Sequence, residues 1–349
     1  MRQHRSPRLL TLIHNPSAGD RRWSAKALRR LLERAGYKVR YQSSKGERFE
    51  AALEDPGELV VVAGGDGTVA KVATRLAGRG APIAILPLGT ANNIATSLGV
   101  EGLPEDLIAT LASARRVRFD LGAAKGPWGE SLFLEAVGFG LIPRMIASAR
   151  SKKKSLRGGA RAFPPFAWEL RLLNRMLRRA PVREATILLD GKQFSRKCLL
   201  LEAMNIGSIG PRLLLAPEAN PGDGHLDLVC VGPDQRRELA RYLEGRLAGR
   251  ERPADFRLAR AKRIEIRWPG TDVHVDDEVP AKQKSRVSLS IGEKRVEFLV
   301  PRQTAPATVR APHPGGPSAL RRSERARRQG NRHAPIPPRA PRSVAPDSR

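Results

Sequence analysis

Along the first 120 residues, apolar residues gather in short runs that are separated by segments with a helical repeat. The runs are rich in Val, Ile and Leu, which is typical of strands buried on both faces. They span residues 9–14, 39–41, 59–63 and 83–86. After Ser24, which can cap a helix, apolar residues recur at helical spacing up to Gly36. Strands that alternate with helices predict a parallel sheet covered by helices on both faces.

The pattern changes near Asp120, where short apolar runs separated by turn residues replace this alternation. Dipeptides such as Asp190-Gly191 and Pro269-Gly270 are typical of tight turns between strands. The predicted strands span residues 119–121, 131–137, 185–189, 197–204, 226–231, 263–267, 274–275 and 287–291. The sequence therefore predicts an α/β domain over residues 1–120 and an antiparallel β domain, packed on the first, over residues 121–301.

Residues 141–183 form a predicted insertion that combines basic side chains with an apolar stripe along a helix around Trp168. Two interpretations stay open: a face that binds an anionic membrane surface, or a core-facing helix with a solvated basic back. Residues 302–349 are rich in Pro and Arg and predict a disordered tail. This tail either holds the protein near anionic lipid or nucleic acid, or only keeps it soluble.

The formal net charge of +28 on 349 residues points to acidic partners: nucleic acid, an anionic membrane surface or phosphorylated ligands. The two cysteines, Cys198 and Cys230, provide neither a disulfide framework nor a zinc spacing. The N-terminus lacks the longer apolar stretch of a signal peptide, and no apolar segment reaches the roughly 20 residues needed to span a bilayer. We therefore expect a cytoplasmic protein that contacts the inner face of the membrane without crossing it.

A glycine-rich turn, Gly64-Gly65-Asp66-Gly67-Thr68, joins a predicted strand to a predicted helix. Glycines let backbone N–H groups approach an anion, and the start of a helix adds a positive dipole end, so this layout favours phosphate binding. Asp66 suggests a contact with Mg²⁺ or an orienting role, whereas the plain alternative makes it the N-cap of an ordinary helix. Residues 15–19 and 89–93 also follow strands, so all three polar loops should meet at one sheet edge.

The set of motifs resembles the diacylglycerol kinase catalytic-domain superfamily, which includes bacterial soluble lipid kinases, sphingosine kinases and ceramide kinases. The likeness covers residues 8–300. The glycine turn is shared with NAD kinases and phosphofructokinases, so it identifies the family only together with the other motifs. In chain order these motifs are Asn15-Pro16-Ser17-Ala18-Gly19, Gly64-Gly65-Asp66-Gly67-Thr68, Leu86-Pro87-Leu88-Gly89-Thr90-Ala91-Asn92-Asn93 and Asp223-Gly224-His225-Leu226-Asp227.

The resemblance implies an NAD kinase/diacylglycerol kinase-like α/β nucleotide-binding domain and a C-terminal antiparallel β-sandwich domain. It places the active site in the interdomain cleft and implies ATP and Mg²⁺ as cofactors. Ser43 or Ser44 would replace a threonine that contacts the nucleotide. The other implied nucleotide contacts are Asn15, Pro16, Ser17, Ala18, Gly19, Gly64, Gly65, Asp66, Gly67, Thr68, Val69, Ala70, Thr90 and Glu278.

The resemblance also implies the catalytic residues. Asp276 would be the general base and Asp66 would position Mg²⁺ or couple to that base through water. Asp277 replaces the usual glycine beside Asp276, and the plain alternative for this turn is a solvated acidic loop. Asn93 stands where an aspartate is common in the family. A structural Mg²⁺ would be bound by Asn220, Asp223 and the carbonyl of His225.

We therefore expect transfer of the γ-phosphoryl group of ATP to a lipid hydroxyl, with diacylglycerol as the first candidate and sphingoid base, ceramide or another lipid alcohol behind it. The chain has no Walker A lysine motif, which excludes a P-loop kinase. A soluble small-molecule kinase and a non-catalytic nucleic-acid-binding protein remain as alternatives. The expected partners are a lipid alcohol and an anionic membrane surface, without specific nucleic acid, and a homodimer is left open.

Overall fold

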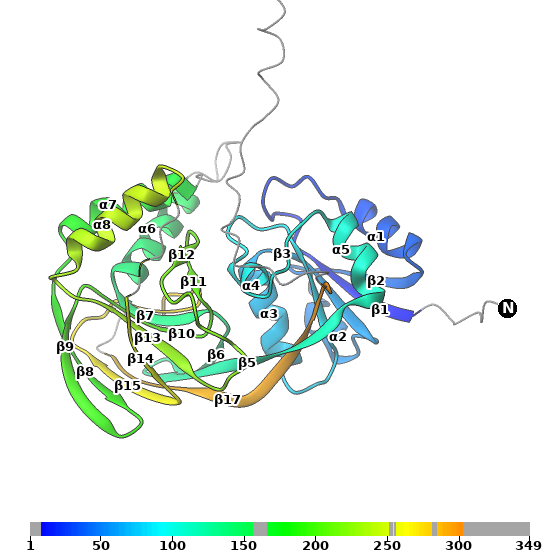
Figure 1. Ribbon diagram of the computed structural model, residues 1–349. Coiled ribbons are helices and arrows are strands. Elements are labelled where there is room, and N and C mark those ends of the chain that lie inside the picture. The colour runs from blue at the N-terminus through cyan, green and yellow to red at the C-terminus, as the bar shows by residue number, and fades with distance from the viewer. Residues whose placement is uncertain (1–7, 156–165, 251–253, 255, 281–284, 303–349) are drawn as a thin grey trace, which may run out of the picture. The chain divides into compact units, whose positions relative to one another are not determined.

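The computed structural model describes residues 8–155, 166–250, 254, 256–280 and 285–302 (Figure 1). The predicted disordered tail, from residue 303 onward, lies outside the described residues, and so do residues 156–165 of the predicted basic insertion.

The first domain is built on four parallel strands in the order β2-β1-β3-β4. They are β1 (Arg8–His14), β2 (Tyr37–Ser43), β3 (Leu59–Gly64) and β4 (Ile83–Pro87). All six residues of β3 are buried, which explains its continuous apolar run. The predicted parallel sheet is therefore confirmed, and its four strands end on the same edge.

Helices connect these strands, as the sequence pattern predicts. The hydroxyl of Ser24 accepts a hydrogen bond from the N–H of Ala27, so the predicted helix cap is present. Leu28 and Leu32 of the first helix are fully buried against the sheet core. The helices of this domain are α1 (Ala25–Arg34), α2 (Phe49–Glu54), α3 (Asp66–Leu76), α4 (Asn93–Ser97), α5 (Pro104–Thr110) and the 3-10 helix η1 (Leu111–Ser113).

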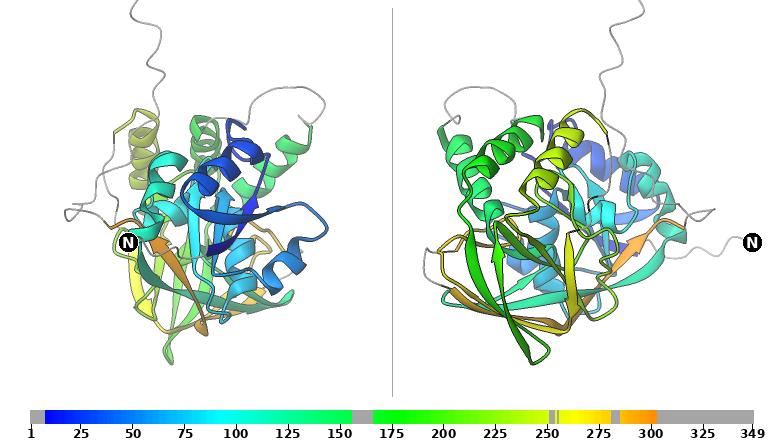
Figure 2. Two further views of the ribbon diagram at one scale, coloured as in Figure 1. Left: turned by 90° about the vertical axis from the view of Figure 1, so that its right-hand side faces the viewer. Right: turned by 60° about the vertical axis from the view of Figure 1, so that its left-hand side comes forward.

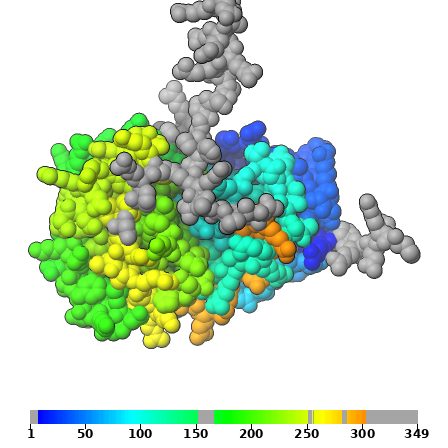
Figure 3. Space-filling model, viewed as in Figure 1, coloured from blue at the N-terminus to red at the C-terminus, as the bar shows by residue number. Residues whose placement is uncertain are grey.

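Two long strands, β5 (Arg115–Gly126) and β17 (Ser285–Val300), join the two domains. The end of β17 pairs in parallel with β4, where Phe298 lies opposite Ile83, so one ten-stranded sheet runs through both domains among the described residues. In the space-filling view the orange surface of β17 lies between the cyan first domain and the yellow part of the second (Figure 3).

The predicted boundary at residue 120 therefore falls inside a strand rather than in a linker. Val296, Phe298 and Val300 pack in the core of the first domain, although they follow the second domain in sequence. Their alternating apolar pattern extends the predicted strand 287–291 to residue 300. The core residues change from Val287 and Leu289 to Val296, Phe298 and Val300, so opposite faces of β17 cover the cores of the two domains.

The second domain is a sandwich of two mainly antiparallel sheets, as predicted. One layer belongs to the long sheet and contains β6 (Gly129–Phe133), β8 (Arg183–Leu189), β9 (Lys192–Cys198) and β15 (Arg263–Trp268) beside β5 and β17. The other layer contains β14 (Arg257–Ala261), β13 (Leu226–Val231), β10 (Leu200–Met204), β7 (Ala136–Gly140) and β16 (Val273–Val275). The short hairpin of β11 (Ser208–Ile209) and β12 (Leu213–Leu214) stands apart.

Two predicted strands, 131–137 and 197–204, are each broken in two. The first breaks at Leu134 and Glu135 between β6 and β7, and the second breaks at Leu199 between β9 and β10. In both cases the chain passes from one sheet of the sandwich to the other. The prediction of single strands was wrong because the apolar run continues while the chain changes sheets.

Three helices, α6 (Leu141–Ser155), α7 (Phe166–Arg178) and α8 (Arg236–Leu247), pack together on one side of the sandwich (Figures 1 and 2). Leu173 and Leu177 of α7 are buried in a core shared with α6 and α8, while the intervening arginines are exposed. The core-facing interpretation of this stretch is therefore correct. Among the described helices, none combines the length and apolar composition that a membrane crossing requires.

Candidate active site

The loop after β3 and the loop after β4 touch each other through two glycines. A Cβ atom placed on Gly89 would lie 2.4 Å from the Cα of Gly65, a distance that no side chain tolerates. The N–H of Leu88 also donates to the carbonyl of Gly64 at 2.9 Å. The glycines are therefore needed because the two backbones lie in contact at this edge.

The loop after β1 joins them. The Nδ2 of Asn15 donates to the Oγ1 of Thr68 at 3.2 Å, and the Oδ1 of Asn15 accepts the N–H of Ser17 at 3.1 Å. Gly19 has a φ of +52°, and a Cβ there would lie 2.3 Å from the carbonyl oxygen of Leu88. The structure thus brings the three predicted loops, 15–19, 64–68 and 89–93, to one place.

Two lysines that the sequence analysis did not single out lie near the end of β2, Lys45 just after the strand and Lys71 on α3. Lys45 donates its N–H to the Oγ of Ser43 at 3.3 Å and its Nζ to the Oγ of Ser17 at 2.8 Å. The Nζ of Lys71 on α3 lies 3.3 Å from the carbonyl oxygen of the buried Ser44. Ser43 is therefore tied to the first loop, and two cations flank it.

Not every residue of the glycine turn faces outward. Thr68 and Val69 are buried, and Val69 packs in the core of the first domain. The side chain of Val69 is therefore committed to packing, and only its backbone is available to a ligand.

Asp66 is the first residue of α3, but its carboxylate acts on another helix. Its Oδ1 accepts the N–H of Ile94 at 2.9 Å, at the start of α4. Gly65, without a side chain, holds the N-cap position of α3, so the plain interpretation of Asp66 as the N-cap of its own helix is wrong. Burial raises the pKa of Asp66, and the backbone N–H groups of residues 92–94 oppose that shift.

Asp276 lies at a tight turn that leads out of β16. Val275 and Glu278 exchange two backbone hydrogen bonds of 2.9 Å across this turn, and Asp276 has a φ of +49°. The Asp276 carboxylate accepts the N–H groups of Leu134, Glu135 and Ala136 at 3.0, 2.8 and 3.2 Å. These N–H groups are available to Asp276 because regular strand pairing is interrupted between β6 and β7. Burial raises the pKa of Asp276 to about 6 despite these hydrogen bonds, and the charge of Asp277 adds to the rise.

A buried ion pair lies next to the turn that contains Asp276. His274 and Glu202 are both fully buried, with 2.8 Å between Nε2 and Oε2, and the Nδ1 of His274 lies 2.6 Å from the carbonyl oxygen of Asp276. Burial lowers the pKa of His274, but the charge and hydrogen bond of Glu202 outweigh it and leave this pKa raised. A Cβ on Gly138 would lie 1.8 Å from Glu202, so glycine there makes room for the pair.

Glu135 is a site residue that the sequence analysis missed. It is buried, and its Oε2 accepts the Nδ2 of Asn93 at 3.0 Å. Burial raises its pKa well above the ordinary range, and the charges of Asp66 and Asp276 raise it further. The available signal was a single acidic residue inside the apolar run Phe-Leu-Glu-Ala-Val.

Hydrogen bonds also connect the first domain to the second around Asn93. Its Nδ2 lies 3.1 Å from the carbonyl oxygen of Gly210, and the Nε of Arg212 donates to the carbonyl of Ala91 at 2.7 Å. These contacts hold the loop after β4 against the β11–β12 hairpin.

A cavity of about 240 Å³ lies between the two domains and contains these groups. One wall is acidic and includes Asp66, Glu135, Asp276 and Asp277. Arg150 of α6 lies 3.5 Å from Asp277. The lining residues from α6 and the start of α7 are Met145, Ile146, Ala149, Arg150, Phe166 and Glu169. Gly67 and Thr90 complete the side nearest the glycine turn, whereas Glu278 is exposed and is not among the lining residues.

Comparison with known proteins identifies the family to which this chain belongs. Residues 9–124 match the model of the diacylglycerol kinase catalytic domain, and residues 159–296 match that of the YegS C-terminal NAD kinase beta sandwich-like domain. The chain is 32% identical over 302 residues to the probable lipid kinase YegS-like of Pseudomonas aeruginosa strain UCBPP-PA14, covering 83% of this chain and 94% of the relative. The chain belongs to the diacylglycerol kinase catalytic-domain superfamily.

Two further comparisons support the fold and class of this kinase. It is 28% identical over 251 residues to the diacylglycerol kinase of Bacillus subtilis strain 168, covering 68% of this chain and 78% of the relative. The crystal structure of a putative diacylglycerol kinase from Bacillus anthracis has the same fold, with a TM-score of 0.62 at 20% identity, and covers 84% of this chain and 98% of that one.

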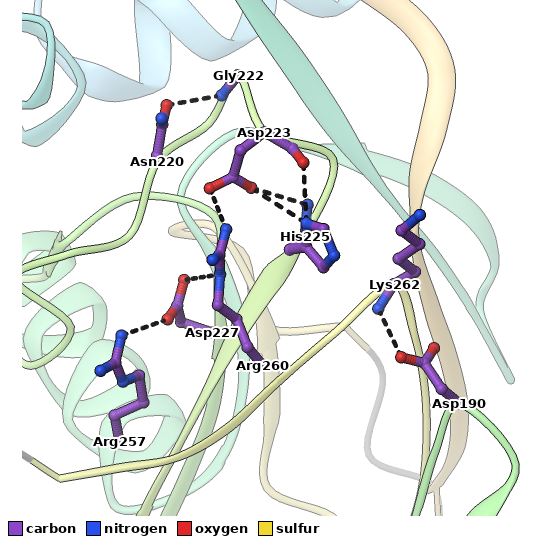
Figure 4. Close-up of polar contacts among 9 residues, drawn as sticks. All are labelled: Asp190, Asn220, Gly222, Asp223, His225, Asp227, Arg257, Arg260 and Lys262. Atoms are coloured by element: carbon purple, nitrogen blue, oxygen red, sulfur yellow. Dashed lines mark hydrogen bonds and ion pairs between the residues drawn. The ribbon is translucent and has the colours of Figure 1, made fainter.

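The structural Mg²⁺ site implied by the resemblance does not match the donor atoms of this kinase. The carboxylate of Asp223 forms an ion pair with Arg260, and its Oδ1 accepts the N–H of His225 at 3.0 Å (Figure 4). The Oδ1 of Asn220 accepts the N–H of Gly222 at 3.0 Å. Across the described part of the chain, no group of three or more His, Cys, Asp or Glu residues could hold a metal ion. The side-chain oxygens of Asn220 and Asp223 therefore already have partners within the protein.

Proposed function

We propose that this kinase transfers the γ-phosphoryl group of ATP to the hydroxyl of a membrane lipid, with diacylglycerol as the acceptor. The observation that carries the proposal is the shared cavity, whose lining includes Asp276, Asp66 and Gly67 of the glycine turn. A phosphoryl donor bound at the turn and a hydroxyl beside Asp276 would therefore meet in one cavity.

The three converging loops suit a nucleotide. Backbone N–H groups at residues 64–68 and the start of α3 provide a positive end for phosphates. Lys45 and Lys71 add cations next to Ser43 and Ser44. Mg²⁺ bound to a nucleotide usually takes only one or two carboxylates from the protein, and Asp66 lines the cavity where such an ion would lie. When bound, that ion would neutralise charge on the β- and γ-phosphates.

Asp276 is suited to remove the proton of the acceptor. Three N–H groups from the β6–β7 break fix its carboxylate, and its side chain lines the cavity. A general base works best when its pKa is close to the working pH, because it is then largely ionised and still basic enough to take a proton. In the transfer step the hydroxyl proton would move to Asp276 and the hydroxyl oxygen would bond to the γ-phosphorus. The bond from the γ-phosphorus to the β,γ-bridging oxygen would break, and ADP would leave.

The apolar part of the cavity lining favours a lipid acceptor over a soluble one. Met145, Ile146, Ala149 and Phe166 line the cavity together with the charged Arg150 and Glu169, which suits an acceptor with a hydroxyl head and an apolar body. The exposed arginines of α7 supply charge that attracts anionic lipid.

The pH dependence of turnover tests the role of Asp276. The base must be ionised, so kcat/KM should fall as the pH drops through about 6. Asp277 raises the pKa of Asp276, so Asp277→Gly should lower that pKa and move the acid limb to lower pH. The measurement is kcat/KM between about pH 4.5 and 8 for both proteins. An acid limb that stays in place or moves upward in the variant would contradict this electrostatic coupling.

The contact with membranes is tested by reversing charge on α7. Arg171, Arg175 and Arg178 are exposed along this helix, and each basic residue near an anionic surface contributes about 1 kcal/mol. Replacing all three with glutamate should lower binding to vesicles of phosphatidylglycerol and phosphatidylcholine by at least about 100-fold, as measured by sedimentation.

A matched control changes the same number of charges elsewhere. The triple glutamate variant of α1 replaces three exposed basic residues of a helix in the first domain, namely Lys26, Arg30 and Arg34. This control should bind vesicles nearly as well as the wild type. Equal losses in both variants would mean that net charge, rather than the α7 face, drives binding.

The preference of the enzyme among different acceptors tests whether diacylglycerol is the substrate. Purified diacylglycerol, sphingosine and ceramide are offered one at a time in detergent mixed micelles with ATP and Mg²⁺, and NAD is offered in solution. We expect the highest kcat/KM with diacylglycerol. Preference for another lipid would change the substrate within the lipid kinase class, whereas preference for NAD would support the soluble small-molecule kinase.

A further inference from the structure

Two acidic and two basic residues meet where the loop at residues 220–225 enters β13. Asp227 on β13 lies opposite Arg260 on the neighbouring strand β14. Asp223 stands above it in the loop, and Arg257 lies on the same strand as Arg260 (Figure 4). The side chains from the loop and the two strands therefore point into one cluster.

Arg260 connects both acids of this cluster. Its Nη2 forms an ion pair with Asp223, and its Nε lies 4.0 Å from the carboxylate of Asp227. Asp227 is almost fully buried, and Arg257 lies 3.5 Å from it on the other side. A buried carboxylate needs a nearby positive charge, and here the two guanidinium groups supply it.

The oxygens of Asp223 and Asn220, two of the three implied metal ligands, have other partners. Asp223 accepts the N–H of His225, its carbonyl oxygen lies 2.8 Å from the Nδ1 of His225, and the side-chain oxygen of Asn220 accepts the N–H of Gly222. A small divalent cation requires several free oxygen ligands at short range. A guanidinium already bound to the main carboxylate also repels such a cation.

We propose that the guanidinium of Arg260 takes the place of a structural metal ion at Asp223, so that this kinase closes the 220–227 loop with its own side chain and without bound Mg²⁺. Mg²⁺ then enters the reaction only with the nucleotide. This inference concerns the folded protein alone and stands whether or not the proposed acceptor is correct.

The loop matters because hydrogen bonds connect it to the catalytic turn. The carbonyl of Pro221 accepts the N–H of Asp120 at 2.6 Å. Asn205 donates from its Nδ2 to the carbonyls of Asp120 and Leu134, both at 3.0 Å. The N–H of Leu134 in turn donates to Asp276. Five polar contacts therefore connect Arg260, through the loop, to the carboxylate that lines the cavity.

The test measures thermal melting of the full chain without nucleotide, in EDTA and across a titration with MgCl₂ alone. The wild type should melt at the same temperature in both conditions. Arg260→Gln should melt several degrees lower in EDTA, because Asp223 and Asp227 then lose a shared cation. The control Arg267→Gln, an exposed arginine on β15 of the same domain, should melt like the wild type.

Arg260→Lys keeps a cation and should stay insensitive to EDTA, which provides a folded variant if Arg260→Gln does not fold. Two results would overturn the proposal. One is a saturable rise in the wild-type melting temperature with MgCl₂ that Asp223→Asn removes, since this reveals a metal site. The other is an Arg260→Gln protein that melts with the wild type in EDTA. Because neither measurement includes ATP or lipid, failure here leaves the kinase proposal untouched.

Discussion

Replacing Asp276 with asparagine is expected to lower the kcat of phosphoryl transfer by about 10²–10⁴-fold, the usual contribution of a positioned general base. Nucleotide affinity should change little, because the glycine turn and its neighbouring loops lie on the first domain. The asparagine keeps the size of the side chain but cannot accept the proton of the acceptor hydroxyl.

The measurement pairs steady-state kinetics with the dissociation constant for ATP. A control variant, Glu293→Gln, changes an exposed carboxylate on β17 that is absent from the cavity lining, and it should retain near wild-type turnover. Melting temperatures establish that both variants fold. Wild-type turnover in Asp276→Asn would assign the base to another group, and Glu135, which lines the same cavity, would be the next candidate.

The second large effect concerns stability. Substituting His274 with leucine should lower the free energy of unfolding by about 3–5 kcal/mol, because it leaves the carboxylate of Glu202 buried without its partner. Both side chains are fully buried, so water cannot replace the lost contact. The same change removes the group next to the carbonyl of Asp276, so turnover should fall as well. Urea unfolding followed by circular dichroism gives the change in stability.

A double variant separates the ion pair from simple packing. Replacing both His274 and Glu202 with leucine removes the two charges together, and such exchanges are often neutral or stabilising. The double variant should therefore be more stable than the single His274→Leu protein. If it is equally unstable or less stable, the loss in the single variant comes from shape rather than from an unpaired charge.

Much of the first domain was predictable because its parallel strands are short apolar runs that alternate with helices. The same pattern located the three polar loops at the ends of β1, β3 and β4, and the structure brings them together. The role of Asp66 was harder to predict. Its carboxylate caps α4, which starts 27 residues later, and helix patterns reveal only caps that are local in sequence.

The second domain was less predictable because its key features depend on pairing between distant segments. The break at Leu134 and Glu135 leaves no mark in an apolar run, yet it frees the N–H groups that bind Asp276. Pairing of Phe298 with Ile83 brings the end of β17 back to the first domain. Arg260 lies 37 residues after Asp223, so the motif around Asp223 alone could not show that its carboxylate is occupied.

The most direct test of the central claim is phosphate transfer from radiolabelled ATP with Mg²⁺ to a mixed bacterial lipid extract in detergent micelles, with the products separated by thin-layer chromatography. The account predicts a labelled lipid whose formation the Asp276→Asn protein nearly abolishes. A folded wild-type protein that labels no lipid, but labels a soluble acceptor from a whole-cell extract, would contradict it.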